Sequence, residues 1–420
     1  MEKPVTAWKN PDYRTFWVGQ SSFPIGFQVT QFILPLLVVH MGAAASMVGF
    51  IRTVHLLPQF LLSVPAGVLA DRFRGRRIMI FGDVVRLLTM TTVMVLFSLH
   101  SFSLWMLFVA VFVLGSATVF YEVCYHPVLR GLLQREQIAS GNFWVELSRA
   151  FATIASPALA GFLIGFLPLW SVLAVDAVVA VISLVTLCLL RAPEPEREPE
   201  AQENISFRMA ADGFYQVFLS PLLRPNVYFV ASRNLFVGMF TTYVLVFKVQ
   251  ELGLSVAAAS VIGVIGNSGF FLGILVSGWL GKRMGFGNLF LAGATSNAIG
   301  LLIVVTAPES NAFIVVTGGL LVYSVGISVV NLQNQILRHS VTPFDMLGRV
   351  NAFLRLANFG MLPVGAFLGG LLVAVFDMRT MLLVSAVGAL ATTVIIVFSP
   401  LRTLRDMPEV EPVWARQRTG

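Results

Sequence analysis

The chain has 420 residues, of which 57% are hydrophobic and only 12% are charged. Soluble globular proteins carry roughly 25% charged residues, so this composition excludes an ordinary soluble domain and is typical of a protein that crosses the membrane many times. The net charge of +7 does not indicate nucleic-acid binding, because the basic residues are scattered over the loops. Cys124 and Cys188 lie inside apolar runs and predict no disulfide framework.

A membrane-spanning helix needs about 20 mostly apolar residues. Twelve runs meet this requirement: 15–39, 45–70, 78–99, 103–125, 142–166, 171–190, 226–247, 256–280, 288–307, 311–334, 350–375 and 380–399. They lack the alternation of barrel strands, so the predicted fold class is an all-α integral membrane protein with twelve transmembrane helices. No basic segment leads into a short apolar one at the N-terminus, so we expect the first run to be a retained span.

Twelve spans place both termini on the same side, and nearly all Lys and Arg residues of the loops fall on that side. Only Lys248 and Arg379 fall in loops on the other side. Because loops rich in Lys and Arg stay in the cytoplasm, we expect a multi-pass protein of the inner (plasma) membrane with both termini cytoplasmic.

The longest cytoplasmic loop separates the predicted domains. We expect a six-helix half at 1–190, a linker at 191–225, a second six-helix half at 226–400 and a cytoplasmic tail at 401–420. The linker opens with a Pro/Glu-rich stretch that is typical of solvated chain. Apolar residues at helical spacing follow, among them Phe214, Val217 and Phe218, and they predict a helix on the membrane surface.

The two halves repeat each other. "GVLADR" at 67–72 recurs as "GWLGKR" at 278–283, and the pair Arg149 and Pro157 recurs as Arg355 and Pro363. Such a repeat predicts two pseudo-symmetric halves of the same topology.

The first of these segments resembles the loop between the second and third helices of the major facilitator superfamily, G-x-L-A-D-R-x-G-R-R, with one extra residue before Gly75. Lys282 replaces the aspartate in the second copy. "QREQIASGN", "SPALAGFL" and "VTPFDMLGRVNAF" further resemble the bacterial branch that exports drugs and siderophores, which includes macrolide efflux proteins and the enterobactin exporter.

The resemblance implies a cytoplasmic gate motif in which Asp71 pairs with basic residues in one state of the gate and releases them in the other. The implied residues are Gly67, Asp71, Arg72, Gly75, Arg76, Arg77, Gly278 and Arg283. Plain anchoring at the membrane surface is the alternative for Arg76 and Arg77. Gly67 is expected to permit close approach of helices.

Ionisable groups inside membrane spans are costly and therefore mark candidate functional sites. We predict that Glu122, Asp83 and His55 are candidates for proton coupling. Each has an alternative: Glu122 could extend to the interface, Arg86 could neutralise Asp83 locally, and hydrogen bonds could satisfy His55. Arg149 is expected to neutralise Glu146 in the same way, and Asp176 is expected to be structural.

Further polar residues in the spans predict a substrate cavity. The candidates are Arg52, Gln28, Gln31, Arg233, Asn234, Asn331 and Gln333. A slight excess of arginines over acids in the spans favours an anionic group on the substrate.

The fifth span carries the signal for the direction of transport. Antiporters of the superfamily carry G-x-x-x-G-P-x-x-G-G there, and "ATIASPALAG" keeps Pro157, Gly161 and the small Ser156. The resemblance implies that this helix packs across the interface between the halves against a glycine face of the eighth span, Gly263 to Gly273. One departure is that residues 103–125 contain no arginine, where drug antiporters of the family usually carry one.

The sequence therefore predicts a monomeric secondary transporter that exports an amphipathic small molecule, such as a drug, macrolide-like compound or siderophore, in exchange for protons. We expect no cofactor, no metal ion and no enzymatic activity. The alternatives are an importer or a lysolipid or solute transporter of the same fold, and a non-transporting receptor or a membrane-embedded enzyme.

Overall fold

A computed structural model describes residues 6–134, 136–191, 214–342 and 346–406; a few side chains inside helices, including those of Asp71, Arg72, Lys282 and Arg355, lie outside the described set. The described chain is helical and contains no β-strand, which confirms the all-α fold class. Ten of its helical segments are long and apolar enough to cross a membrane, and Gly360–Val375 is a shorter apolar helix. The chain divides into an N-terminal unit, Met1–Ile205, and a C-terminal unit, Ser206–Gly420.

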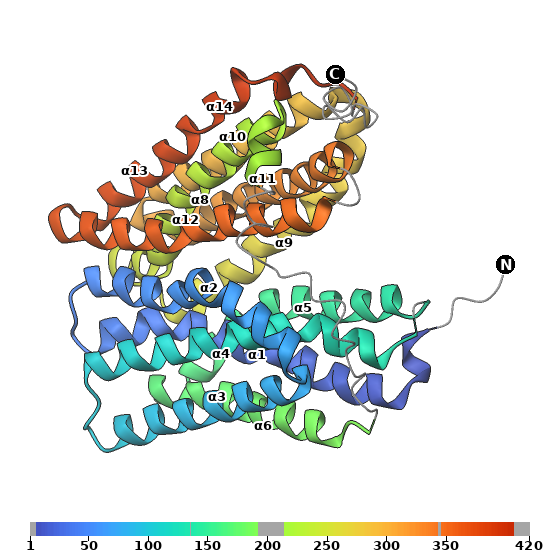
Figure 1. The fold of residues 1–420 in the computed structure, drawn as a ribbon. Coiled ribbons are helices and arrows are strands. Elements are labelled where there is room, and N and C mark those ends of the chain that lie inside the picture. Colours follow the sequence, from blue (N-terminus) through green and yellow to red (C-terminus); the bar gives the residue numbers. More distant parts are fainter. Residues whose placement is uncertain (1–5, 135, 192–213, 343–345, 407–420) are drawn as a thin grey trace. The chain divides into compact units, whose positions relative to one another are not determined.

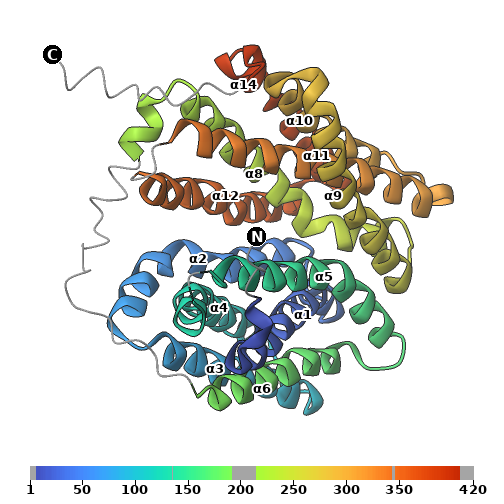
Figure 2. The same cartoon turned by 90° about the vertical axis from the view of Figure 1, so that its right-hand side faces the viewer.

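The N-terminal unit is a bundle of long helices joined by short connections (Figure 1). They are α1 (Pro11–His40), α2 (Ser46–Arg72), α3 (Gly75–Ser98), α4 (Leu104–Leu132), α5 (Ile138–Ile164) and α6 (Ala174–Leu189), with short 3-10 segments at Ala7–Lys9 and Leu169–Leu173. Helix α1 packs against α5 and α6, α4 packs against α2 and α3, and α3 packs against α6 (Figure 2).

The C-terminal unit is a second helical bundle. It contains α8 (Leu223–Val246), a π-helical turn (Phe247–Glu251), α9 (Val256–Met284), α10 (Phe286–Val305), α11 (Ala312–Val341), α12 (Leu347–Val375), α13 (Met378–Ala391) and α14 (Thr393–Val397). Helix α11 packs against α9 and α10, and α8 packs against α12 and α13.

Two apolar clusters fill the interior of the N-terminal unit. One contains Phe16, Met79 and Tyr125, and the other contains Ile33 and Met90. Met79 and Met90 lie on the same helix, α3, so the two clusters occupy different heights of the bundle. Asp83 and Arg86, which are described below, lie between Met79 and Met90 on α3.

Several helices extend beyond the predicted spans. Helix α4 continues to Leu132 and α11 to Val341, because the ends of a helix outside the apolar layer need hydrogen bonds but not apolar side chains. The placement of Lys248 in an outer loop was wrong. The π-helical turn carries α8 onward, Lys248 is 5% exposed, and its Nζ donates to the Ala259 carbonyl at 3.2 Å.

The linker helix predicted on the membrane surface is described from residue 214, and residues 214–219 are helical. Val217 is fully buried in the core of the C-terminal unit, and the Phe218 ring packs against Tyr228 and Phe353. Phe214 remains about half exposed. The segment thus docks on its own unit through one face, which the apolar spacing alone could not distinguish from docking on lipid.

Helix α13 begins at a capping aspartate just outside its span. Asp377 accepts hydrogen bonds from the backbone N–H of Thr380 at 2.8 Å and from its hydroxyl at 2.7 Å. These hydrogen bonds lower the pKa of Asp377. The charged cap satisfies backbone donors at the end of the helix and lies at the positive end of the helix dipole.

Glycines bring α10 and α11 into backbone contact. A Cβ atom at Gly326 would meet the backbone of Asn297 and Gly293, and one at Gly300 would meet the backbone of Tyr323. Small residues at such crossings let helices approach closely in membranes, where packing rather than the hydrophobic effect holds helices together.

This contact predicts the effect of a single methyl group. We expect Gly326→Ala to lower the free energy of unfolding by about 1–3 kcal/mol, because rigid backbone faces the new atom. Gly318→Ala on the same helix is the matched control: a Cβ there meets nothing within 4 Å, so its higher helix propensity should leave stability unchanged or raised by up to about 1 kcal/mol. Thermal unfolding of the two purified variants in detergent measures the difference, and equal melting temperatures would contradict the close contact.

Candidate functional site

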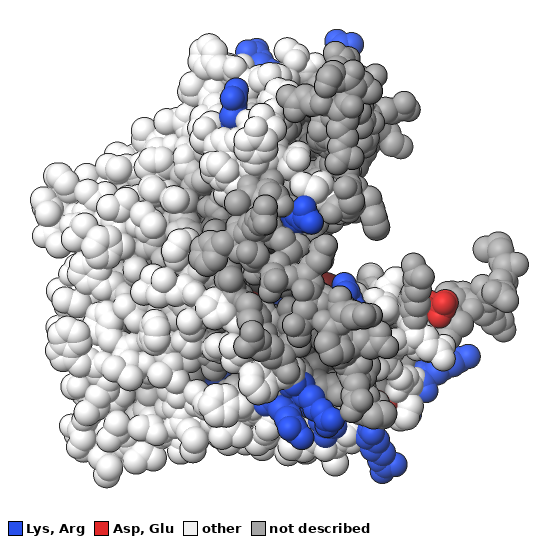
Figure 3. Space-filling model, viewed as in Figure 1, with Lys and Arg blue, Asp and Glu red and all other residues white. Residues whose placement is uncertain are grey.

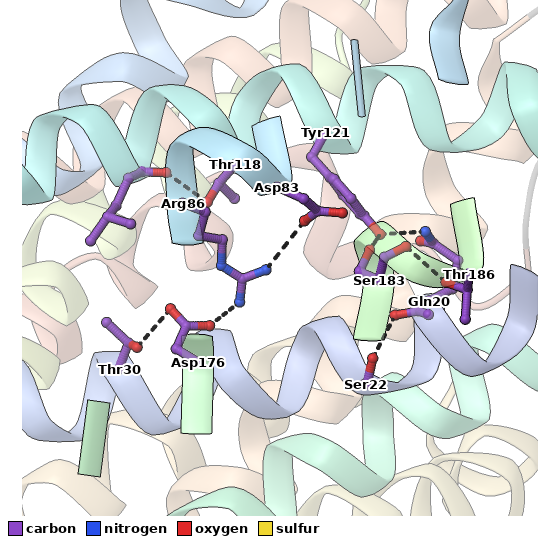
Figure 4. Close-up of polar contacts among 12 residues, drawn as sticks. Gln20, Ser22, Thr30, Asp83, Arg86, Thr118, Tyr121, Asp176, Ser183 and Thr186 are labelled. Carbon is purple, nitrogen blue, oxygen red and sulfur yellow. Dashed lines mark hydrogen bonds and ion pairs between the residues drawn. The ribbon is translucent and has the colours of Figure 1, made fainter. Parts of the chain in front are cut away.

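The N-terminal unit contains an ion pair between two helices. Arg86 of α3 contacts Asp176 of α6 through its Nη2 atom, and Thr30 of α1 donates its hydroxyl to the same carboxylate at 3.0 Å (Figure 4). The Arg86 guanidinium also lies over the ring of Phe23, 4.3 Å from its centroid. The sequence did not reveal this pair, because its two residues are 90 positions apart.

Asp83 lies one turn from Arg86 on the same helix and is completely buried. Its Oδ1 atom is 4.0 Å from Arg86 Nη1, so the predicted local pair is present only at the limit of contact. Among the described residues neither oxygen of Asp83 has a hydrogen-bond partner at bonding distance. The Ser183 hydroxyl interacts with this carboxyl, but its hydrogen bond at 2.8 Å joins it to Tyr121.

A hydroxyl and amide chain extends this layer toward α1. Gln20 donates to the Tyr121 hydroxyl at 2.6 Å, and Tyr121 contacts Ser183 of α6. The Tyr121 ring stacks on Phe23 with centroids 4.2 Å apart. Helices α1, α3, α4 and α6 thus each contribute a polar side chain to one buried layer (Figure 4).

Three predicted residues meet between α1 and α2. Arg52 donates to the Gln31 carbonyl oxygen, and the Gln31 amide nitrogen lies 2.7 Å from His55 Nε2. His55 is buried, and its ring faces Phe27. Gln28 points elsewhere and donates to Thr153 of α5 at 3.1 Å. The arrangement gives His55 a hydrogen bond, as the alternative interpretation of that residue expected, and places an arginine beside it.

The two remaining acids of the predicted set differ in environment. Glu122 is half-buried on α4 and has interactions with its surroundings. Glu146 pairs with Arg149 at 3.8 Å, as their spacing predicts, and its side chain is 63% exposed.

The C-terminal unit buries an arginine among amides. Arg233 of α8 is 3% exposed and donates through Nε to the Asn297 side-chain oxygen at 3.1 Å. Its Nη1 lies 3.4 Å from the Asn234 oxygen, whereas its Nη2 has no hydrogen-bond partner within the described chain. Asn297 in turn donates to the Tyr323 carbonyl at 3.2 Å. Arg233 and Asn234 are residues that the sequence predicted for the cavity, whereas Asn297 was not among them, although an asparagine inside an apolar span was a visible signal.

The other cavity candidates of this unit point in different directions. On α11 Asn331 is exposed, whereas Gln333 is 4% exposed. The hydrogen bonds described for the arginine cluster include neither residue. The structure therefore does not join them to Arg233.

The gate motif is described in part. Asp71 and Arg72 end α2, and their side chains lie outside the described set. Arg76 donates to the carbonyl of Cys188 at 3.0 Å in the last turn of α6, so it satisfies an unpaired carbonyl at the negative end of that helix. Arg77 is exposed at the start of α3, whose first residue is Gly75.

Gly67 and Gly278 lie at corresponding positions of the two halves. Among the described residues of the chain, a Cβ atom at either glycine meets nothing within 4 Å. Close packing inside their own units therefore does not require these glycines. Arg283, next in the second motif, lies over the Trp279 ring at 4.3 Å from its centroid.

The small residues on α5 and α9 that were predicted to indicate the direction of transport differ in their neighbours. Ser156 and Gly161 of α5 are buried, and Pro157 lies between them. The glycine face of α9 is used within the C-terminal unit: Cβ atoms at Gly269 and Gly273 would meet residues of α11. The α9–α11 contact inside the C-terminal unit thus accounts for these two glycines, and packing of this helix against α5 stays a prediction.

Exposed arginines gather at one end of the N-terminal unit (Figure 3). They are Arg14, Arg74, Arg77, Arg130 and Arg191. Most of the remaining surface of this unit in the same view carries no charge, as expected for a surface in contact with lipid. Nowhere in the described chain do three His, Cys, Asp or Glu side chains converge to hold a metal ion.

Comparison with known proteins gives a consistent result. The sequence profile described as Major Facilitator Superfamily matches residues 16–361. The chain is 24% identical over 388 residues to macrolide efflux protein A of Streptococcus pyogenes, covering 88% of this chain and 91% of that protein. It is 25% identical over 327 residues to macrolide efflux protein A of Enterococcus faecalis, covering 74% and 94%.

Solved structures share the fold at low identity. The nucleoside transporter NupG superposes with a TM-score of 0.75 at 14% identity, covering 91% of this chain and 98% of that one. A bacterial homologue of the iron transporter ferroportin superposes with a TM-score of 0.70 at 16% identity, covering 92% and 98%.

The Arg233 cluster predicts the effect of removing its amide partner. We expect Asn297→Ala to lower the free energy of unfolding by about 1–2 kcal/mol, because the buried Nε–H of Arg233 loses its acceptor while the longer contact with Asn234 remains. Asn288→Ala on the same helix is the control, since Asn288 is exposed and its side chain donates to the Met284 carbonyl at the α9–α10 connection at 3.2 Å. Thermal unfolding of both variants in detergent measures the effect, and an unchanged Asn297→Ala variant would show that Arg233 has another acceptor.

Proposed function

The chain belongs to the Major Facilitator Superfamily, and on this premise we propose that it exports an amphipathic small molecule from the cytoplasm in exchange for protons. The observation that carries the proposal is the similarity to macrolide efflux proteins over 88% of the chain. The substrate is a drug, a macrolide-like compound or a siderophore, and transport proceeds by alternating access of a monomer.

Buried ionisable groups support the coupling to protons. Asp83 is fully buried on α3, and His55 is buried beside Arg52 on α2. Ionisable residues inside spans are rare and mark ion pathways or proton relays in transporters. A proton that moves inward gains about 2.3 kcal/mol per 100 mV of membrane potential, which is sufficient to drive export without ATP.

Polar residues on the first helices and the buried Arg233 support a polar substrate contact within an otherwise apolar interior. Gln31 and Arg52 form a polar group in the N-terminal unit. In the C-terminal unit, Nη2 of Arg233 has no hydrogen-bond partner among the described residues. Each unit thus carries a buried or half-buried arginine that suits an anionic group on an amphipathic substrate. The gate role of Asp71 is carried over from the family motif.

The arginine-rich end of the N-terminal unit supports the orientation. Exposed arginines gather where α2 joins α3 and where α1 begins. Since such segments remain in the cytoplasm, both termini are proposed to be cytoplasmic in the inner membrane.

Export is tested by drug accumulation in efflux-deficient cells. We expect wild-type protein to lower the accumulation of at least one lipophilic antibiotic or dye, and a protonophore to abolish the difference. Asp71→Asn is expected to abolish it as well, because the gate loses its acidic residue. Asp406→Asn is the matched control, since Asp406 is an exposed acid beyond the last helix.

Two results would contradict this proposal in different ways. If the protein lowers the accumulation of no compound in the panel, a dedicated substrate such as a lysolipid is indicated. Export that persists in the presence of the protonophore would show that the proton gradient does not drive transport.

The orientation is tested by thiol labelling in intact cells. Cys188→Ser removes the exposed natural thiol, and Cys124 is buried. On this background we expect an impermeant maleimide to label Glu309→Cys, which lies in the connection between α10 and α11. Asp406→Cys should be labelled only after the cells are permeabilised. The opposite pattern would reverse the orientation.

A further inference from the structure

The buried layer of the N-terminal unit holds two carboxyl groups and one guanidinium. Asp83 is 0% exposed, Asp176 is 2% exposed and Arg86 is 3% exposed. If both carboxyl groups were ionised, the layer would hold a net negative charge inside the membrane, which is costly. One carboxyl group therefore holds a proton in the arrangement seen here.

The contacts identify which carboxyl group is ionised. Asp176 contacts Arg86 through Oδ1 and accepts the Thr30 hydroxyl through Oδ2 at 3.0 Å. It also lies in the first turn of α6, at the positive end of the helix dipole. Asp83 lies beyond the first two turns of α3, away from the positive end of that helix, and its Oδ1 atom is 4.0 Å from Arg86 Nη1. Asp176 thus has the environment of an anion, and Asp83 that of a neutral acid.

We propose that Asp83 is the residue that binds the proton and that Arg86 exchanges between Asp176 and Asp83 as this proton leaves and returns. When the O–H bond of Asp83 breaks, the proton passes to water and the electron pair stays on the carboxylate. Arg86 remains protonated throughout. Its contact with Asp176 breaks, and a contact with Asp83, one helical turn away, forms.

The structure provides the space and the reach for this exchange. A Cβ atom at Gly26 of α1 would overlap the Asp176 carboxylate and would lie 3.0 Å from Arg86 Nη2, so glycine there makes room for the ion pair. Arg86 Nη1 has no hydrogen-bond partner among the described residues and already points toward Asp83 (Figure 4). A rotation about the arginine side chain suffices to change its partner.

The exchange changes the contacts between helices. In the arrangement seen here Arg86 joins α3 to α6, and Thr30 joins α1 to the same carboxylate. After the exchange Arg86 pairs within α3, and Asp176 retains only its contact with α1. The inference rests on the proposed proton coupling and assigns it to one residue.

The side chains that surround Asp83 come from its own helix and from α1, α4 and α6. Arg86 lies on its own helix, Tyr121 faces it from α4 and Asp176 from α6. From α1 the layer receives Gln20 and Thr30, which do not titrate.

Thermal unfolding of the purified full-length protein in detergent, from about pH 5.5 to about pH 8.5, tests the inference. The folded wild type holds a proton at Asp83 that the unfolded chain releases, so its melting temperature should fall by several degrees as the pH rises. Asp83→Asn keeps the shape of the neutral acid. We expect the melting temperature of this variant not to fall as the pH rises, and we expect it to be at least as stable as wild type at the highest pH.

Two further variants complete the design. Asp176→Asn leaves Asp83 as the remaining carboxylate for Arg86, so it should also lose the fall, but with a lower melting temperature at every pH. Glu146→Gln is the matched control, because Glu146 has the same spacing to an arginine but is exposed, and it should keep the wild-type profile.

Two outcomes overturn the inference. In one, Asp83→Asn retains the wild-type pH profile, so another group holds the proton. In the other, Asp83→Asn fails to fold or is less stable than wild type at every pH, which indicates a permanently ionised Asp83 held by Arg86. Gly26→Ala provides an independent variant, since it should disturb the Arg86–Asp176 pair and flatten the profile without altering any charge.

Efflux measurements separate this inference from the proposed function. If a protonophore inhibits export by the wild type but not by Asp83→Asn, the result supports both the proposed proton antiport and the assignment of the proton to Asp83. If wild-type export ignores the protonophore, the proposed antiport fails, and the melting profile alone decides whether Asp83 holds a proton.

Discussion

The interior of the N-terminal unit depends on one requirement: a charge placed inside a membrane must find a partner within the protein. Arg86 meets it through Asp176, a residue from a different helix, and Thr30 completes the contact from a third. The apolar clusters next to this layer consist mostly of residues that fill space, although Tyr121 and Phe23 of one cluster also contact the polar residues. The ion pair therefore sets how α1, α3 and α6 lie with respect to one another at this height.

The two units bury arginine in different chemical surroundings. Arg86 has the carboxyl groups of Asp176 and Asp83 around it, and these groups can gain or lose a proton. Arg233 has the side-chain oxygens of Asn297 and Asn234, which hold no charge of their own. The repeat that relates the halves in sequence has thus not preserved the chemistry of their interiors. Such a difference is compatible with one half binding the coupling ion and the other contacting an anionic group.

Much of the fold was predictable, because apolar runs of about 20 residues leave few alternatives to spanning helices. The partners of buried polar residues were not predictable, because they depend on which helices become neighbours. Spacing within α3 suggested that Arg86 neutralises Asp83, yet the better geometry belongs to Asp176, 90 residues away. Lys248 was placed in a loop because the apolar run stops before it, whereas the chain continues as a π-helical turn in which Phe247 and Lys248 are buried.

The contact between Arg76 and the carbonyl of Cys188 gives α3 a second connection to α6. Arg76 and Arg86 lie ten residues apart on α3, which corresponds to about 15 Å along the helix axis. The two helices also pack directly against each other. The polar contacts at Arg76 and Arg86 therefore add two fixed points that define the rotation and the axial position of α3 against α6, which apolar packing alone defines less strictly. Release of the Arg86 contact would leave the Arg76 contact and the packing in place.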